Sequence, residues 1–171
     1  MKPFITFSFV LALASLTGLV ADSQTPAPPS GAAVTWGKPV DGLEVGISCD
    51  SSVTNSGEFP KLFFYVVNVG DKDIPDVIQS GSLCIVTVNG RHYAQNFYEG
   101  KSSYMPPGRK YGPLLIRADI LRLIPELQAW PIVSQIAPRP ELQKGTNTVS
   151  VRYMLGEKKL VASGEIQIIA K

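Results

Sequence analysis

The alternation of apolar and polar residues is the strongest structural signal in this chain, and its most apolar folded segment is 61–69. This segment is rich in β-branched and aromatic residues and contains neither glycine nor proline, which is typical of a strand. Both of its faces are apolar, with Leu62, Phe64 and Val66 on one and Phe63, Tyr65, Val67 and Val69 on the other. A strand that is apolar on both faces is usually central and covered on both sides. We therefore expect it to be the central strand of a β-sandwich.

Shorter segments on either side show period-two alternation or turn signals. A half-buried strand is predicted at 43–49, and 82–88 is followed by Asn89-Gly90, the strongest short-range signal for a tight hairpin, so 91–98 should return as its partner. Further extended segments are expected at 73–78, 111–116, 148–155 and 160–169. About eight short strands separated by turn signals predict an all-β fold, an immunoglobulin-like β-sandwich.

The period of the apolar pattern changes between 117 and 130. Apolar residues then recur at steps of three and four, at Ile116, Ile120, Leu123, Ile124, Leu127 and Trp130. This spacing predicts a short helical insertion, which Pro125 limits to one or two turns. We expect the insertion to cover the apolar face that carries Phe63 and Tyr65.

The first 33 residues predict export. Met1-Lys2 is a short positive segment, 4–20 is apolar, and Ala21-Asp22-Ser23 suits signal peptidase. An uncleaved membrane anchor is the alternative. We expect a signal peptide at 1–23, a Pro/Ala/Ser-rich linker at 24–33 and one β-sandwich domain at 34–171. The mature protein would then be secreted or periplasmic and have no transmembrane segment.

Export changes the interpretation of Cys49 and Cys84, the two cysteines of the chain. An even number of cysteines in an oxidising compartment predicts one disulfide. Closing the loop between them would stabilise the fold by about 4 kcal/mol. The alternative is two buried thiols that pack as small apolar side chains.

Composition narrows the possible functions. The chain has 171 residues, of which 18% are charged, and a formal net charge of +2 with scattered basic residues. This is no electrostatic footprint for nucleic acid. The single histidine, His92, has no nucleophile or orienting partner visible in the sequence, so we expect no catalytic site and no cofactor.

The best candidate contact residues surround the Pro106-Pro107-Gly108 turn. They are Tyr98, Tyr104, Arg109, Lys110 and Tyr111. Tyrosine and arginine in a loop at the end of a sandwich are typical binding residues. The alternative is that the tyrosines pack against the sandwich and the basic pair only faces solvent.

Two weaker candidates have structural alternatives that we favour. Asp71, Asp73 and Asp76 could bind calcium, but their spacing matches no known loop and aspartate is common in turns. Trp36 and Trp130 could stack on sugar rings, although a tryptophan more often covers one end of a small core.

Four segments, at 36–43, 68–70, 107–108 and 142–151, together resemble a secreted immunoglobulin-like domain of planctomycete-type bacteria. Trp36-Gly37-Lys38-Pro39-Val40-Asp41-Gly42-Leu43 is similar to its Trp-Gly-x-x-Val-x-Gly-Leu opening. Asn68-Val69-Gly70 and Pro107-Gly108 match its turns, and 142–151 is similar to its Leu-x-x-Gly-x-x-x-Val-x-Val approach to the last hairpin. The resemblance implies an immunoglobulin-like fold and export over about 36–169, and it implies no catalytic residues because that family is largely uncharacterised.

These observations predict a non-catalytic exported domain that binds a protein or a cell-envelope component through its loops. The alternative is a secreted inhibitor or assembly accessory that inserts a loop or pairs an exposed strand edge. An unprotected edge strand with little charge would favour this alternative. The partner's identity and the oligomeric state do not follow from the sequence.

Overall fold

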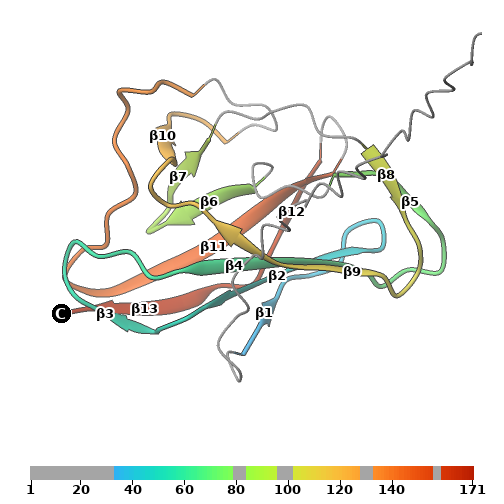
Figure 1. Ribbon diagram of the computed structural model, residues 1–171, viewed down its shortest axis with the longest axis horizontal. Coiled ribbons are helices and arrows are strands. Elements are labelled where there is room, and N and C mark those ends of the chain that lie inside the picture. Colours follow the sequence, from blue (N-terminus) through green and yellow to red (C-terminus); the bar gives the residue numbers. More distant parts are fainter. Residues whose placement is uncertain (1–32, 79–83, 96–101, 128–132, 156–158) are drawn as a thin grey trace, which may run out of the picture.

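A computed structural model describes residues 33–78, 84–95, 102–127, 133–155 and 159–171. The described residues form thirteen strands and no helix, which confirms the predicted all-β class. None of them belongs to a helix long and apolar enough to cross a membrane. The strands form a four-stranded sheet, a seven-stranded sheet and a separate two-stranded pair (Figure 1).

The four-stranded sheet is built around the segment that the sequence marks as central. Its order is β1 (Thr35–Trp36), β2 (Leu43–Cys49), β4 (Leu62–Asn68) and β9 (Lys110–Ile116). β4 pairs antiparallel with β2 on one side and β9 on the other. Residues 62–66 are all buried, so both faces of β4 are covered, as the sequence predicts.

The seven-stranded sheet contains the predicted hairpin and most of the carboxyl-terminal half. Its order is β10 (Arg122–Ile124), β7 (Arg91–Ala94), β6 (Cys84–Val88), β11 (Gly145–Leu155), β13 (Ile166–Ala170) and β3 (Val53–Thr54), with β12 (Lys159–Ala162) also paired to β11. Asn89 and Gly90 join β6 to β7 with φ angles of 49° and 78°. These left-handed residues confirm the hairpin, because a two-residue turn of this kind requires positive φ at both positions.

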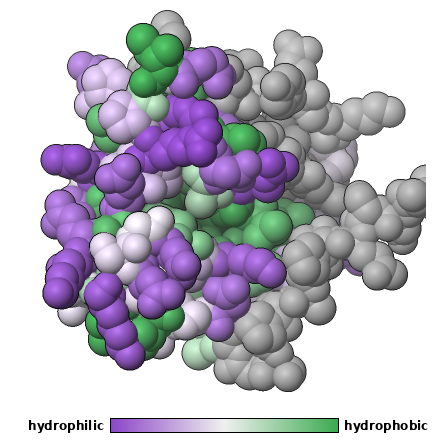
Figure 2. All heavy atoms as spheres, turned by 60° about the vertical axis from the view of Figure 1, so that its left-hand side comes forward, coloured by the Kyte–Doolittle hydropathy of each residue, from purple (hydrophilic) through white to green (hydrophobic). Residues whose placement is uncertain are grey.

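One apolar core lies between the two large sheets. Alternate residues of β2 and β4 face alternate residues of β6 and β11, and the rings of Phe64 and Tyr153 stand 6.0 Å apart across this interface. On the described part of the face that Figure 2 shows, hydrophilic residues predominate and apolar ones appear in smaller areas between them. The two facing sheets are consistent with the predicted β-sandwich.

The pair β5 (Ile74–Ile78) and β8 (Ser102–Met105) lies at one end of the molecule (Figure 1). The strands expected from the sequence do not include this segment, whose apolar pattern is weak, so β8 is an addition that the structure makes. Ile74 lies opposite Met105 in this pair, and both side chains are buried. Burial of Met105 stabilises this strand, although the two prolines and the glycine that follow it in the sequence predict a turn.

The predicted helical insertion is wrong for 117–127. This segment forms a turn at 118–120, the strand β10 and a bend, and β10 pairs with β7. Leu121 and Ile124 are buried whereas Ile120 and Leu127 are each 39% exposed, so the apolar positions do not share one helical face. Trp130 lies outside the described residues.

The predicted disulfide is not formed in the structure. Cys49 ends β2 opposite Leu62 in one sheet, and Cys84 begins β6 opposite Tyr153 in the other. Burial raises the pKa of the Cys84 thiol to about 12, and it also raises the pKa of the half-buried Cys49 thiol, with Asp50 adding to the effect. Cys49 and Cys84 instead match the alternative stated above, in which two thiols pack as small apolar side chains.

The two thiols should therefore react at different rates without any reductant. Because thiolate is the reactive form, native protein should be alkylated slowly at Cys49 and only on unfolding at Cys84. Intact mass after alkylation in denaturant, with no reductant present, should show two labels. An unlabelled protein that gains two labels only after reduction would establish the disulfide instead.

Candidate functional site

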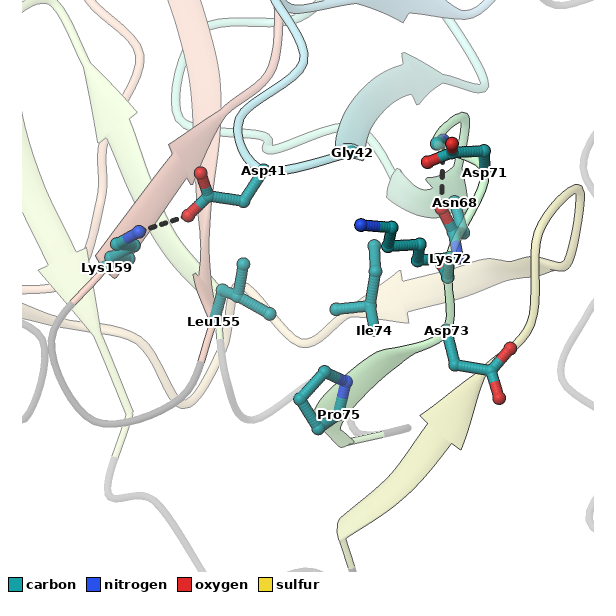
Figure 3. A pocket seen from close by; sticks show the side chains of 11 residues that line it. Asp41, Gly42, Asn68, Asp71, Lys72, Asp73, Ile74, Pro75, Leu155 and Lys159 are labelled. Carbon is teal, nitrogen blue, oxygen red and sulfur yellow. Dashed lines mark hydrogen bonds and ion pairs between the residues drawn. The ribbon is translucent and has the colours of Figure 1, made fainter.

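A cavity of about 520 Å³ opens at the end of the molecule where β4 leaves its sheet (Figure 3). Its wall consists of the turn at 41–42, the segment 68–75, and Leu155 and Lys159 of β11 and β12. The volume is in the range of ordinary ligand pockets. Loops from both large sheets therefore enclose one concave site.

Asn68 holds these loops together from inside the protein. Its side chain is fully buried, and its Nδ2 donates to the carbonyl oxygens of Lys72 and Met105 at 2.8 and 2.7 Å. Its Oδ1 accepts from the backbone N–H of Gly70 at 2.9 Å. One amide thus satisfies three backbone groups of two different segments, which defines the path of both.

The backbone of Asn68 connects two more segments. Its carbonyl accepts from Gly108 N at 2.8 Å and its N–H donates to Arg109 O at 3.0 Å, while the next residue, Val69, donates to Gly42 O at 2.8 Å. The segments 40–42, 68–75 and 104–109 are therefore neighbours. We call these three segments the loop end.

The turn at 41–42 requires special backbone angles. Asp41 and Gly42 both have positive φ, 50° and 81°. A Cβ on Gly42 would stand 3.3 Å from the Cα of Gly70, so glycine also permits the close approach of the two segments. Gly70 itself does not have a positive φ.

The charges around the cavity are unevenly balanced. Asp41 forms an ion pair with Lys159 and thereby joins the turn at 41–42 to β12. In Figure 3 the ammonium group of Lys72 points into the cavity, whereas the carboxylate of Asp73 points away from it. Asp71 also lines the cavity, and among the side chains that the structure describes neither Lys72 nor Asp71 nor Asp73 forms an ion pair.

The floor of the cavity is apolar. Ile74, Pro75 and Leu155 line it below the ammonium group of Lys72 (Figure 3). Ile74 is held there by the pairing of β5 with β8 and is only 7% exposed. The cavity therefore places an apolar surface beside charged side chains of both signs.

The residues predicted to make contacts do not line this cavity. Tyr104 is 71% exposed on β8, and Arg109 lies in the loop end with its guanidinium 5.8 Å from the ring of Tyr111. Lys110 points elsewhere, with its Nζ 4.7 Å from the centre of the Tyr65 ring. Tyr98 lies outside the described residues. The structure thus brings Tyr104 and Arg109 to the loop end and turns Lys110 onto the sheet.

Trp36 packs on the outer face of the four-stranded sheet. Its ring lies 6.1 Å from that of Tyr65 and 5.3 Å from Nζ of Lys110, and Tyr65 also hydrogen-bonds Ser48 at 3.2 Å. Tyr65 is 4% exposed. Trp36 therefore packs within the fold, but on the outer face of a sheet and not over one end of the core.

The insertion was expected to cover Phe63 and Tyr65, and the contacts do not support this. The described contacts of the Tyr65 ring come from Trp36 and Lys110, while β10 joins the seven-stranded sheet through β7. Phe63 is 1% exposed. On the outer face, Tyr65 is therefore covered by side chains of β1 and β9, which belong to the same sheet as Tyr65.

The calcium hypothesis gains no support from the described side chains. Asp71 and Asp73 lie along the loop end, and the side chain of Asp76 is outside the described part. Among the described residues no three histidine, cysteine or acidic side chains are grouped as metal ligands would be.

His92 belongs to a small polar group on the outer face of the seven-stranded sheet. Its Nδ1 is 3.0 Å from the hydroxyl of Thr87, which also accepts from Nη1 of Arg152 at 2.6 Å. Partial burial lowers the pKa of His92, and the nearby charge of Arg152 lowers it further. His92 is therefore a partly buried histidine on a strand.

Sequence reasoning missed the residues that build the cavity. Asp41, Lys72, Leu155 and Lys159 are separated widely along the chain and carry no motif. The sequence did predict a turn at Asn68-Val69-Gly70, and this turn was the one local pattern that pointed to the region of the cavity. It gave no indication that the asparagine is fully buried.

Comparison with known proteins gives no relative of this chain: no family model, curated protein or solved structure matches it.

Replacing Asn68 with alanine should destabilise the protein and loosen the loop end. Three backbone groups would lose their partner, so we expect a loss of about 2–3 kcal/mol in the free energy of unfolding. The measurement is urea denaturation followed by tryptophan fluorescence. Asn55→Ala is the control, because the Asn55 side chain bonds only Glu58 at the surface and should cost less than about 0.5 kcal/mol. Equal losses in the two variants would contradict this role for Asn68.

The polar group at His92 should make stability depend on pH. The pKa of His92 in the folded protein lies below its usual value, so the unfolded chain binds the proton more readily. The contribution of His92 to the free energy of unfolding should therefore be constant above about pH 6.5, and the stability should fall as the pH drops below this value. Urea midpoints at about pH 7.5 and about pH 5 should differ less in His92→Gln than in the unmodified protein. The same difference in both proteins would show that His92 has no part in it.

Proposed function

We propose that this chain is an exported, non-catalytic domain that binds a protein or cell-envelope component through its loop end. The proposal takes the sandwich to be of immunoglobulin-like type, as the resemblance at Trp36-Gly37 and Asn68-Val69-Gly70 implies. Its support is a cavity in loops that a buried amide holds in one arrangement. Loops fixed on a rigid scaffold suit binding because little ordering entropy is lost on contact.

Three of the eight exposed large apolar side chains in the described part of the chain lie at the loop end. Val40, Val69 and Tyr104 are exposed by 37%, 49% and 71%, and they belong to the three segments of the loop end. Aromatic and aliphatic side chains surrounded by charged ones are typical of protein contact surfaces. A protein or an envelope component with apolar groups is thus the favoured partner class.

The alternative of strand-edge pairing has one candidate strand. β9 is the longest edge strand in the described part of the chain, and its outer side has no partner there. It carries Pro113, which has no N–H to donate, and Gly112 with a φ of 108°. Both residues interrupt the regular edge that an added strand needs, so the loop end is the better supported site.

Capture of the partner by matched variants tests this function. The full chain with a carboxyl-terminal tag is incubated with envelope and secreted fractions, alongside Tyr104→Lys and a control, Ile136→Lys. Both substitutions replace a highly exposed apolar residue, because Ile136 is 95% exposed, but only Tyr104 belongs to the loop end. We expect a dominant partner that the control retains and Tyr104→Lys loses. Capture by neither the unmodified chain nor the control, or equal capture by all three proteins, would contradict the proposal.

A further inference from the structure

The strands of the seven-stranded sheet carry positive charges and no negative ones. They contain no aspartate or glutamate, and their basic residues are Arg91, Arg122, Arg152 and Lys159. Lys159 is paired with Asp41, and the guanidinium of Arg122 donates to three backbone carbonyl oxygens. Arg91 and Arg152 form no ion pair among the described side chains.

Arg152 is partly buried on the outer face of this sheet, beside His92. Its Nη1 donates to the hydroxyl of Thr87 at 2.6 Å, and this hydroxyl lies 3.0 Å from Nδ1 of His92. Burial and then the charge of Arg152 lower the pKa of His92, and no described carboxylate opposes them. Because a charge that is removed from water normally has an oppositely charged partner, the other N–H groups of this guanidinium suit an anion from outside the protein.

A cavity of about 460 Å³ lies at His92, where β7 begins and the neighbouring strand β10 ends (Figure 1). Its described lining residues, none of them acidic, are Gly90, Arg91, His92, Leu123, Ile124 and Pro125. Glu126 follows Pro125 in the chain but does not line the cavity, and it forms no ion pair with a described basic side chain. The described lining therefore combines basic groups with an apolar wall and includes no carboxylate.

We infer that this cavity binds the phosphate group of a phosphate monoester, with Arg91 and Arg152 as its cationic partners. Such a phosphate carries a charge of about −1.5 to −2 near neutral pH, which matches two guanidinium groups, whereas a carboxylate matches one. Arginine also fits phosphate oxygens well, because its planar group presents paired N–H donors. The organic part of the ester would lie on Leu123 and Pro125, where its apolar surface leaves water.

This site is separate from the loop end. Thr87 lies opposite Ser150 of β11, and Leu155, which lines the cavity at the loop end, is about 17 Å farther along the same strand. The inference therefore goes beyond the proposed function and does not depend on it.

Three small ligands test the inference on the full chain, by calorimetric titration in a buffer without phosphate. Butyl phosphate is the monoester, pentanoate carries the same aliphatic chain on a carboxylate, and inorganic phosphate has no organic group. We expect butyl phosphate to bind about tenfold more tightly than pentanoate, because it makes one more charge-assisted contact. Inorganic phosphate should bind more weakly than the ester, since it cannot use the apolar wall. No binding of butyl phosphate, or equal binding of either of the other ligands, overturns the inference.

Two variants locate the binding site. Arg91→Gln and Arg152→Gln should each weaken the binding of butyl phosphate about tenfold. Lys61→Gln removes one positive charge next to β4 in the other large sheet and should keep the affinity. Arg91 is exposed, so its variant remains informative if Arg152→Gln is destabilised. Unchanged affinity in either folded variant overturns the inference.

Vesicles distinguish a lipid phosphate from a soluble ester. Phosphatidylcholine vesicles with and without phosphatidic acid are sedimented with the unmodified chain and with Arg91→Gln. Sedimentation that requires both phosphatidic acid and Arg91 assigns the phosphate to a lipid headgroup. Binding of butyl phosphate without such sedimentation assigns it to a soluble ester, and phosphatidic acid that retains Arg91→Gln equally well overturns the lipid as the ligand of this cavity.

Discussion

A buried amide must find all its hydrogen-bond partners inside the protein, and Asn68 finds them in the backbone of two segments that are distant in sequence. Its bonds to Lys72, Gly70 and Met105 fix where the chain leaves β4 and where β8 ends. An apolar side chain could fill the same space but would leave these polar groups without partners. The cavity and the loop end both depend on this one side chain.

The four-stranded sheet shows how the second face of β4 is covered without another sheet. Gly46 lies between Trp36 and Tyr65, and a Cβ there would stand 2.7 Å from the tryptophan ring. The missing side chain lets the two rings meet across β2, and Lys110 then packs over both. Lys110, which the sequence predicts to contact a partner, instead makes cation–π contacts within the fold that help to hold β1 and β9 against β4.

The cavity differs from this face because its charges come from separate elements. Asp41 belongs to a turn of one sheet and Lys159 to a strand of the other, so their ion pair links the sheets at the rim. Lys72 comes from the segment that Asn68 organises and remains directed into the open space. The loop end thus combines an apolar floor with charged side chains of both signs, of which only Asp41 and Lys159 are paired with each other among the described residues.

The sequence by itself determined the features that depend on neighbouring residues. The apolar run of β4 and the Asn89-Gly90 hairpin were both predicted, because strand alternation and turn geometry are local properties. The helix predicted at 117–127 was wrong because a spacing of three and four between apolar residues is also compatible with a turn followed by a strand. In that arrangement, the strand that pairs with β10 decides which of the apolar side chains are buried. The thiol state of Cys49 and Cys84 and the assembly of the cavity were decided only by the tertiary structure. Both depend on strand register and on which distant side chains become neighbours, and no local pattern in the sequence encodes either.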